Sequence, residues 1–478
     1  QESRGLGDVY KRQQQRVQCA CGVSHEYVET AKSCPVNKSS SGMNRKNNAE
    51  ISNVNNSFSA GVDAFADDDL YDEEFSYTLD EMGTNNNGQV VEPQQLQQEA
   101  KVEIKSLYNR VQQAVKDNNT SELLQVFKDA GNSQNYVNAL ATMDDMQKNK
   151  NWSGRKDVDK NVANRYRAMV AYAGYAYMRE SGKIDDISDL SGQDIGNARS
   201  DGYAESNTHE WHMMRYSGMG GSDLNGMLNS HNNAFDKDGN PLQNTPEYGG
   251  GTRTFPNNYY AKNVDRILKS KIDPPTEEYS SGTFNNYSPD SDSPDWSSPF
   301  TQGNALEDIT AHLASEKLGK NIGHTKHTYV DDSGMRVNFD YLIVDDKGKP
   351  SESLEIKTTG KIGKYGDPKH GIDALPYEVR AQALEQCVMG GFEKGNLAVL
   401  EGGRNVKVIS WDMTPGLEKE AQRNRQRAKK FYSAAQSLRD VPKEQRESMI
   451  TDEFLENAGV NVKAYRKSQE AMSKWNKK

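Results

Sequence analysis

The chain has 478 residues, of which 34% are hydrophobic and 27% are charged, and its mean hydropathy is −0.93. This length has room for about three domains of roughly 150 residues each, but so polar a composition keeps a large share of the chain outside any core. We therefore expect one well-packed domain, one helical region and long polar segments.

The sequence contains no segment that we expect to cross a membrane. The longest near-apolar run, Ala168 to Met178, is far shorter than the ~20 residues that span a bilayer, and the first residues lack the apolar stretch of a signal peptide. Four cysteines do not make a disulfide framework at this length and fit a reducing compartment. We expect a cytoplasmic protein with no membrane partner.

The net charge of −10 is unevenly distributed. Residues 61–91 hold nine Asp or Glu and no Lys or Arg, whereas residues 413–478 hold 15 Lys or Arg against nine Asp or Glu. The average charge therefore does not exclude a partner with a phosphate backbone. The acidic run itself is typical of a solvated tail.

Residues 1–92 are expected to be disordered. The first 13 resemble translated sequencing-adapter sequence and are excluded from fold reasoning; residues 14–60 are rich in Asn, Ser and Gln, and the acidic tail follows. Cys19, Cys21 and Cys34 lie here with His25. Their spacing does not give the two paired ligand steps of a zinc site.

Residues 93–205 are predicted to be a helical region whose role the sequence does not indicate. Helices are expected over 93–117, from Thr120-Ser121-Glu122 onward, and over 157–180. The last of these has an apolar stripe at helical spacing: Val158, Val162, Met169, Val170, Ala173 and Tyr177.

Residues 206–412 are predicted to form an α/β domain, and residues 413–478 a basic helical C-terminal extension. A polar insertion at about 231–300 interrupts the domain, and its proline-rich end is typical of a surface loop. The run Asp236 to Asn240 mimics a calcium loop, but its glycine comes too early for an EF-hand, so a hairpin turn is expected.

The most informative segment is a predicted hairpin of strands 337–344 and 354–358. Glu355 and Lys357 are two residues apart and project from the same strand face, and Asp340 on the other strand would lie beside Glu355. Two adjacent carboxylates favour a cation between them, and oxygen ligands suit Mg²⁺ or Mn²⁺. Lys357 would then serve a water that attacks a phosphodiester. The alternative is an ordinary Glu-x-Lys pair on an exposed strand.

Two helices supply further candidates. Glu307 falls in the early turns of a helix that ends near Gly319, and Gln382 falls in a helix over 376–389, before strands 396–400 and 406–409. Both side chains would face the hairpin. Alternatively, Glu307 is a helix N-terminal acid favoured by the dipole, and Gln382 has no special role.

A fourth motif surrounds Arg215. Glycines follow it, and Ser222 is predicted to cap a helix over 223–229. A helix N-terminus and a hydroxyl beside an Arg fork would bind a phosphate. An ordinary capped helix is the alternative.

In chain order, these segments resemble the YqaJ-like viral recombinase, or lambda exonuclease, family of the PD-(D/E)xK nuclease superfamily. The resemblance covers about 208–412 without the insertion. Its motifs are Trp-x3-Arg-x6-Ser from Trp211, Gly-x3-Glu from Gly303, Asp340 followed by Glu-x-Lys, and the Gln382 helix ending in Gly391. Their shared order is more specific than any one motif.

The resemblance implies an α/β fold with a central mixed sheet flanked by helices. It also implies a Mg²⁺- or Mn²⁺-dependent phage-type exonuclease that digests linear double-stranded DNA from its ends, 5′ to 3′, in recombination. By analogy alone it implies a homotrimer ring and a single-strand annealing protein as partner.

The resemblance also implies roles for individual residues. Metal ligands would be Asp340, Glu355, Glu307 and the carbonyl of Ile356. Lys357 would serve the attacking water, and Gln382 would complete the catalytic site. Arg215 and Ser222 would hold the 5′-terminal phosphate of the DNA.

Some positions depart from the family pattern. Leu384 stands where a second Gln is common, Tyr377 is farther from Gln382 than expected, and only Lys361 or Lys364 could replace a further phosphate-binding Arg. The rival readings are a RecB-like or defence DNA endonuclease and a non-catalytic DNA- or protein-binding module on a nuclease fold. Cys387 is alone in the core, which disfavours iron–sulfur relatives.

Overall fold

The computed structural model describes residues 93–149, 155–182, 188–190, 192–204, 208–227, 260–276, 288–291, 294–360, 363 and 365–475. It also places four two-residue strands, β1 (Val17–Gln18), β2 (Ser24–His25), β3 (Gly83–Thr84) and β4 (Val90–Val91). The described residues from 83 onward belong to one compact unit.

Several predictions concern residues outside this part of the chain. They are the disorder and the adapter-like start within residues 1–92, the cysteine segment, most of the 231–300 insertion with its calcium-like loop, and the substitute lysines Lys361 and Lys364.

The chain is a mixed α/β protein with two mixed sheets and 13 α-helices in its described part. The larger sheet has the order β14-β13-β12-β11-β8-β5. Its strands are β5 (Ser188–Asp189), β8 (Asn321–His324), β11 (Tyr341–Val344), β12 (Pro350–Thr359), β13 (Lys394–Glu401) and β14 (Asn405–Asp412). Strand β12 pairs antiparallel with β11 and parallel with β13. The predicted strands 396–400 and 406–409 are confirmed.

The predicted hairpin is confirmed in its second half and corrected in its first. Strands β11 and β12 pair across a turn in which Asp345 Oδ1 accepts from the backbone N–H groups of Lys347 and Lys349. The predicted single strand 337–344, however, is two strands in different sheets, β10 (Met335–Val337) and β11. The break falls at residues 338–340, where the Asp340 carboxylate accepts from the Ile356 N–H.

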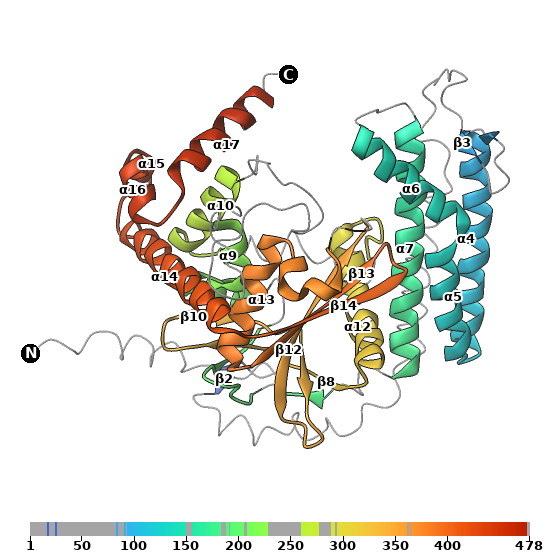
Figure 1. The fold of residues 1–478 in the computed structure, drawn as a ribbon, viewed down its shortest axis with the longest axis horizontal. Helices are drawn as coiled ribbons and strands as arrows, with labels where there is room; N and C mark the ends of the chain where they lie inside the picture. Colours follow the sequence, from blue (N-terminus) through green and yellow to red (C-terminus); the bar gives the residue numbers. More distant parts are fainter. Residues whose placement is uncertain are drawn as a thin grey trace, which may run out of the picture. The chain divides into compact units, whose positions relative to one another are not determined.

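Two helices cover opposite faces of the larger sheet: α12 (Pro299–Leu318) and α13 (Tyr377–Gly390) (Figure 1). Leu354, Ile356 and Ala398 pack with alanines of α12, whereas Leu397 and Val399 pack with α13. This alternation follows from the two-residue period of a strand. It leaves Glu355 and Lys357 on the face that α13 covers.

The smaller sheet has the order β6-β9-β10-β7. It consists of β6 (Arg199–Tyr203), β7 (Met219–Gly220), β9 (His327–Val330) and β10. Helices α8 (His209–Tyr216) and α9 (Gly221–Met227) flank β7. This sheet therefore places the Arg215 segment next to the chain that leads into β11.

The N-terminal helices are α4 (Pro93–Lys116), α5 (Thr120–Asn132), α6 (Gln134–Asn149) and α7 (Arg155–Ser181). The three predicted helices are confirmed, although Asn119, not Thr120 or Ser121, caps α5. A Cβ on Gly174 of α7 would lie 3.2 Å from Ile309 Cγ2 of α12, and Arg167 Nη2 donates to the carbonyl of Gly360 at 3.2 Å. The helical region therefore packs directly on the elements that carry the candidate site.

Helix α10 (Tyr260–Ile272) lies within the range read from the sequence as a polar insertion, where no helix was expected. Its apolar residues Val264, Ile267 and Leu268 are buried in a core cluster. The helix also buries Lys271, whose partners are described below.

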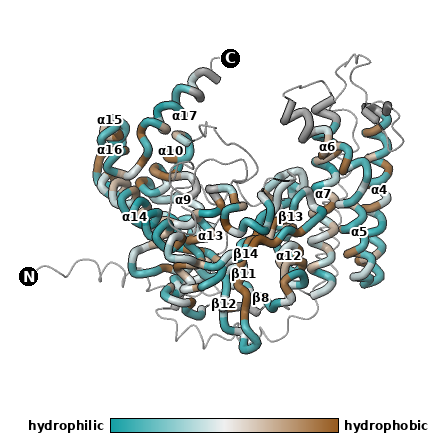
Figure 2. The backbone as a smooth tube through the Cα atoms, viewed as in Figure 1, coloured by the Kyte–Doolittle hydropathy of each residue, from teal (hydrophilic) through white to brown (hydrophobic). Residues whose placement is uncertain are grey.

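The C-terminal extension is helical, as predicted: α14 (Pro415–Ser437), α15 (Lys443–Met449), α16 (Asp452–Asn457) and α17 (Val462–Trp475). A short 3-10 helix, η5 (Pro368–Ala374), precedes α13. Figure 2 shows hydrophobic segments along the strands of the larger sheet and a largely hydrophilic α14. None of the helices in the described ranges combines the length and apolar character needed to cross a membrane.

Candidate active site

The predicted hairpin residues meet around the ammonium group of Lys357. Lys357 Nζ donates to Glu355 Oε1 and, at 3.0 Å, to the carbonyl oxygen of Ile356. It also lies 3.9 Å from Asp340 Oδ2. The Asp340 and Glu355 carboxylates predicted from the hairpin, and the Ile356 carbonyl implied by the family resemblance, therefore converge on one cationic group.

Asp340 reaches this cluster because it sits at the break between the two sheets. Its Oδ2 accepts from the Ile356 N–H at 2.9 Å, which fixes the carboxylate against β12. The side chain remains 24% exposed, so it is accessible from solvent, unlike the fully buried Glu355.

Two amides of α13 hold the Glu355 carboxylate. Gln382 Nε2 donates to Glu355 Oε1 at 2.7 Å, and Gln386 Nε2 donates to Oε2. Gln386 also lies 3.5 Å from the carbonyl of Asn338. The sequence analysis identified Gln382 but missed Gln386, although a spacing of four residues places both on one helix face.

The buried carboxylate of Glu355 resists ionisation. Burial, and then the charge of Asp340, raise the pKa of Glu355 to about 7, although Lys357 and Gln386 act in the opposite direction. Burial alone would lower the pKa of Lys357, but Glu355 and Asp340 outweigh it and raise that pKa above its usual value. Positive charge is therefore stabilised where the oxygens converge.

Glu307 on α12 takes part in this electrostatic cluster without a hydrogen bond to it in the described structure. Burial, followed by the carboxylates of Asp340 and Asp308, raises the pKa of Glu307 to about 8. Asp308 itself accepts from the Tyr341 hydroxyl. Glu307, predicted as a metal ligand, is therefore coupled electrostatically to Asp340, and its raised pKa leaves the carboxyl largely protonated at neutral pH.

Arg215 and Ser222 are brought together as predicted, with Arg215 Nη2 donating to Ser222 Oγ at 2.6 Å. The guanidinium also lies over the Trp211 ring, 4.6 Å from its centroid. Ser222 is not the predicted helix cap, because α9 already begins at Gly221. Asp223 instead accepts from the Gly220 N–H at 2.9 Å.

A buried ion pair supports the Arg215 cluster. Lys271 Nζ of α10 lies 2.8 Å from Asp223 Oδ2, and Arg215 Nη2 lies 3.3 Å from Asp223 Oδ1. Burial alone would raise the pKa of Asp223, but Lys271 and Arg215 hold it at about 2. Two cations face one carboxylate, so the cluster keeps a net positive charge.

The two clusters are neighbours. A Cβ on Gly221 would lie 3.1 Å from Gln382 Cγ, and Gln382 contacts Glu355 directly. Glycine at this position allows α9 to approach α13 closely. The positively charged cluster of Arg215 is thus separated from the carboxylate cluster by Gln382 alone.

The donor atoms around Lys357 Nζ are of the kind that a hard divalent cation takes, namely carboxylate and carbonyl oxygens. No three His, Cys, Asp or Glu side chains of the described ranges gather as a metal-binding group. The set consists of two side chains and the Ile356 carbonyl. In this structure the cation that these oxygens contact is the Lys357 ammonium. Their chemistry also fits a divalent metal ion.

No family model, curated protein or solved structure matches the chain. The site is therefore interpreted from its own geometry.

Proposed function

We propose that the chain is a metal-dependent deoxyribonuclease with a PD-(D/E)xK core that hydrolyses linear double-stranded DNA from its ends. One observation supports this proposal most: Asp340, Glu355 and the Ile356 carbonyl converge on the ammonium of Lys357. A metal ion held by these oxygens beside a lysine is suited to activate a water molecule for attack on a phosphodiester.

In this proposal Asp340, Glu355 and the Ile356 carbonyl hold Mg²⁺ or Mn²⁺, and Glu307 adds a further carboxylate once a nearby cation favours its ionised form. The bound metal supplies Lewis acidity toward a phosphoryl oxygen and toward water. Lys357 moves off the oxygens that it now contacts and orients the attacking water. Glu355 stays in place because Gln382 and Gln386 hold both of its oxygens.

The Arg215 cluster is proposed to bind the 5′-terminal phosphate. The Arg215 side chain is 34% exposed, and Ser222, whose hydroxyl it contacts, is an exposed residue. Arg and a hydroxyl together provide charge and directed donors for a phosphate. Because this cluster adjoins Gln382, a terminal phosphate bound there would position the first linkages near Asp340, which favours 5′-to-3′ digestion.

Two further parts of the proposal depend on the sequence resemblance alone. They are assembly as a homotrimer ring and cooperation with a single-strand annealing protein in recombination. Sedimentation analysis of the purified chain tests the first.

The decisive experiment is a Mg²⁺ time course on linear duplex, covalently closed circle and single strand, with 5′-phosphate and 5′-hydroxyl ends compared. Preferential loss of the linear 5′-phosphorylated duplex, abolished by EDTA, is expected. Cleavage of the closed circle would instead indicate an endonuclease. No cleavage, together with no Mn²⁺ binding by calorimetry, would indicate a non-catalytic DNA- or protein-binding module.

A further inference from the structure

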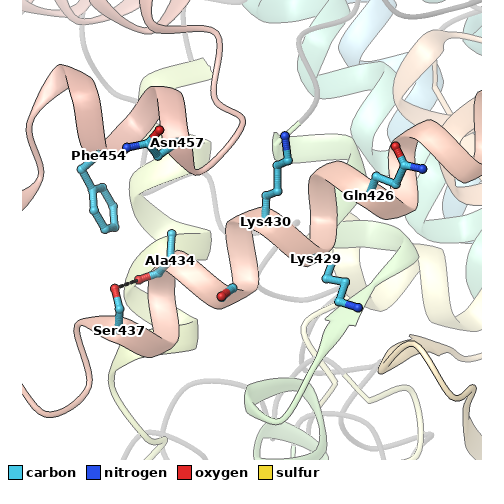
Figure 3. A pocket seen from close by; sticks show the side chains of 8 residues that line it. Gln426, Lys429, Lys430, Ala434, Ser437, Phe454 and Asn457 are labelled. Atoms are coloured by element: carbon cyan, nitrogen blue, oxygen red, sulfur yellow. Dashed lines mark hydrogen bonds between the residues drawn. The ribbon is translucent and has the colours of Figure 1, made fainter.

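A groove of about 670 Å³ lies between α14 and α16, away from the carboxylate cluster. Figure 3 shows Phe454 of α16 projecting toward α14 near Ala434, with Lys430 and Lys429 farther along the same helix. The volume lies within the range of ordinary ligand sites. The nuclease proposal gives this groove no role.

Two lysines of a basic segment, Lys429 and Lys430 of α14, line the groove. Residues 421–439 contain six Lys or Arg and no Asp or Glu. Arg425 is engaged with Glu385 and Asp331, but Lys429 and Lys430 are exposed and have no ion-pair partner among the described residues. Two lysines that line the groove without an ion-pair partner among the described residues favour a negatively charged occupant.

The groove also has an apolar patch, formed by Phe454 of α16 and Ala434 of α14, beside the polar Asn457, Ser433 and Ser437. Phe454 and Ala434 are partly buried and pack against the core cluster beneath them. The hydroxyl of Ser437 donates to the Ala434 carbonyl at 2.7 Å, within α14. No carboxylate lines the groove. An occupant would therefore combine acidic groups with an apolar or aromatic side chain, which a nucleic-acid backbone alone does not provide.

The chain itself contains a segment of this chemistry. Residues 65–75, outside the described part, read Phe-Ala-Asp-Asp-Asp-Leu-Tyr-Asp-Glu-Glu-Phe, with six acids, three aromatic residues and no base. Acids alternate in short blocks with Phe65, Tyr71 and Phe75, so carboxylates and rings are presented together. We propose that the α14–α16 groove, defined by Lys429, Lys430, Ala434 and Phe454, binds residues 65–75 of the chain.

Binding would place an aromatic ring of the segment against Phe454, where ring contacts are favourable, and carboxylates against the two lysines. Such charge-assisted contacts at an exposed rim weaken as salt screens them. The interaction needs neither metal nor DNA. A binding experiment on the groove can thus succeed or fail independently of the proposed nuclease activity.

The test uses a fluorescein-labelled peptide of residues 63–77 and full-length protein in which the six acids of 65–75 are replaced by Asn or Gln. Fluorescence anisotropy in EDTA should show binding to this protein, and at least tenfold weaker binding to wild type, whose own segment competes. Adding Lys429→Glu and Lys430→Glu to the amide-substituted protein should weaken binding at least tenfold, as should adding Phe454→Ala. The control pair Lys419→Glu and Lys443→Glu replaces exposed lysines outside the groove and should change nothing.

Equal peptide binding by wild type and the amide-substituted protein would overturn the proposal, because the chain's own segment would not occupy the site. Binding that survives the Lys429 and Lys430 reversal would also overturn it. If a duplex oligonucleotide instead binds through these lysines and the peptide does not, the groove is a nucleic-acid surface and the proposal is wrong.

Discussion

Lys357 Nζ lies 3.9 Å from Asp340 Oδ2, although Asp340 precedes the hairpin and Lys357 is near its far end. The contact exists because the predicted first strand breaks at Asp340, which turns the carboxylate toward β12. A residue within a continuous strand would instead have its direction fixed by the pleat. The break between the two sheets therefore brings Asp340 to the cluster.

Asp340→Asn should abolish Mg²⁺-dependent digestion of linear duplex while leaving the fold intact. The amide can still accept from the Ile356 N–H, but it removes the negative charge that a cation needs. We expect a loss of about 1,000-fold or more, or ~4 kcal/mol of transition-state stabilisation. Initial rates and Mn²⁺ calorimetry measure the effect, and Asp346→Asn, an exposed carboxylate of the hairpin turn, is the control. Wild-type rates for Asp340→Asn would show that the site is misassigned.

Lys357→Ala should also abolish digestion, but with the opposite effect on metal binding. Removing the ammonium frees Glu355 and the Ile356 carbonyl, so Mn²⁺ affinity should be retained or increased while the attacking water loses its partner. Calorimetry and a rate assay on the same preparation separate the two effects. Digestion at the wild-type rate would contradict the role given to Lys357.

Gln386→Leu should lower digestion by about 10- to 100-fold, the usual effect of removing a group that orients a metal ligand. The buried Glu355 carboxylate would lose one of two amide donors, which also costs about 1–3 kcal/mol of stability. Rates at saturating Mg²⁺ and urea unfolding test this. The exposed Gln422 provides a matched control as Gln422→Leu. Unchanged rates with a lower stability would make Gln386 purely structural.

The sequence predicted the local parts of the site well. Glu355 and Lys357 share a face because strand alternation is a local rule, and the turn at Asp345 and the αL cap at Gly391 have direct residue signals. These features depend on neighbours in the chain. They could therefore be predicted from the types of the residues at and next to each position.

The parts that the sequence did not reveal depend on packing between distant segments. The apolar run that includes Val337 and Phe339 reads as one strand, and only the two sheets divide it. Lys271 lies in a range read as a polar insertion, yet it is buried against Asp223. No local pattern distinguishes a lysine that finds a buried carboxylate from one that faces solvent.

Arg215→Gln should selectively impair digestion of 5′-phosphorylated ends. The change removes the charge and the fork beside Ser222, whereas the carboxylate cluster is untouched. We expect a loss of about tenfold or more on 5′-phosphate ends and little loss on 5′-hydroxyl ends, with partial retention in Arg215→Lys. An equal loss on both ends would count against a phosphate pocket.

The Asp223–Lys271 pair should make the protein sensitive to acid between about pH 4 and pH 2. The folded pKa of Asp223 is about 2, below its usual value of 3.8. The carboxylate therefore stabilises the fold fully at pH values above 3.8, and this stabilisation is lost as the pH falls through the folded pKa. The difference corresponds to about 2 kcal/mol. Asp223→Asn should be less stable at pH 7, because Lys271 is left buried without its carboxylate.

The gap in unfolding free energy between wild type and Asp223→Asn should therefore narrow by roughly 2 kcal/mol from pH 5 to pH 2 in urea titrations, since the wild type alone loses the charge. A gap that stays constant over this range would show that folding does not lower the pKa of Asp223.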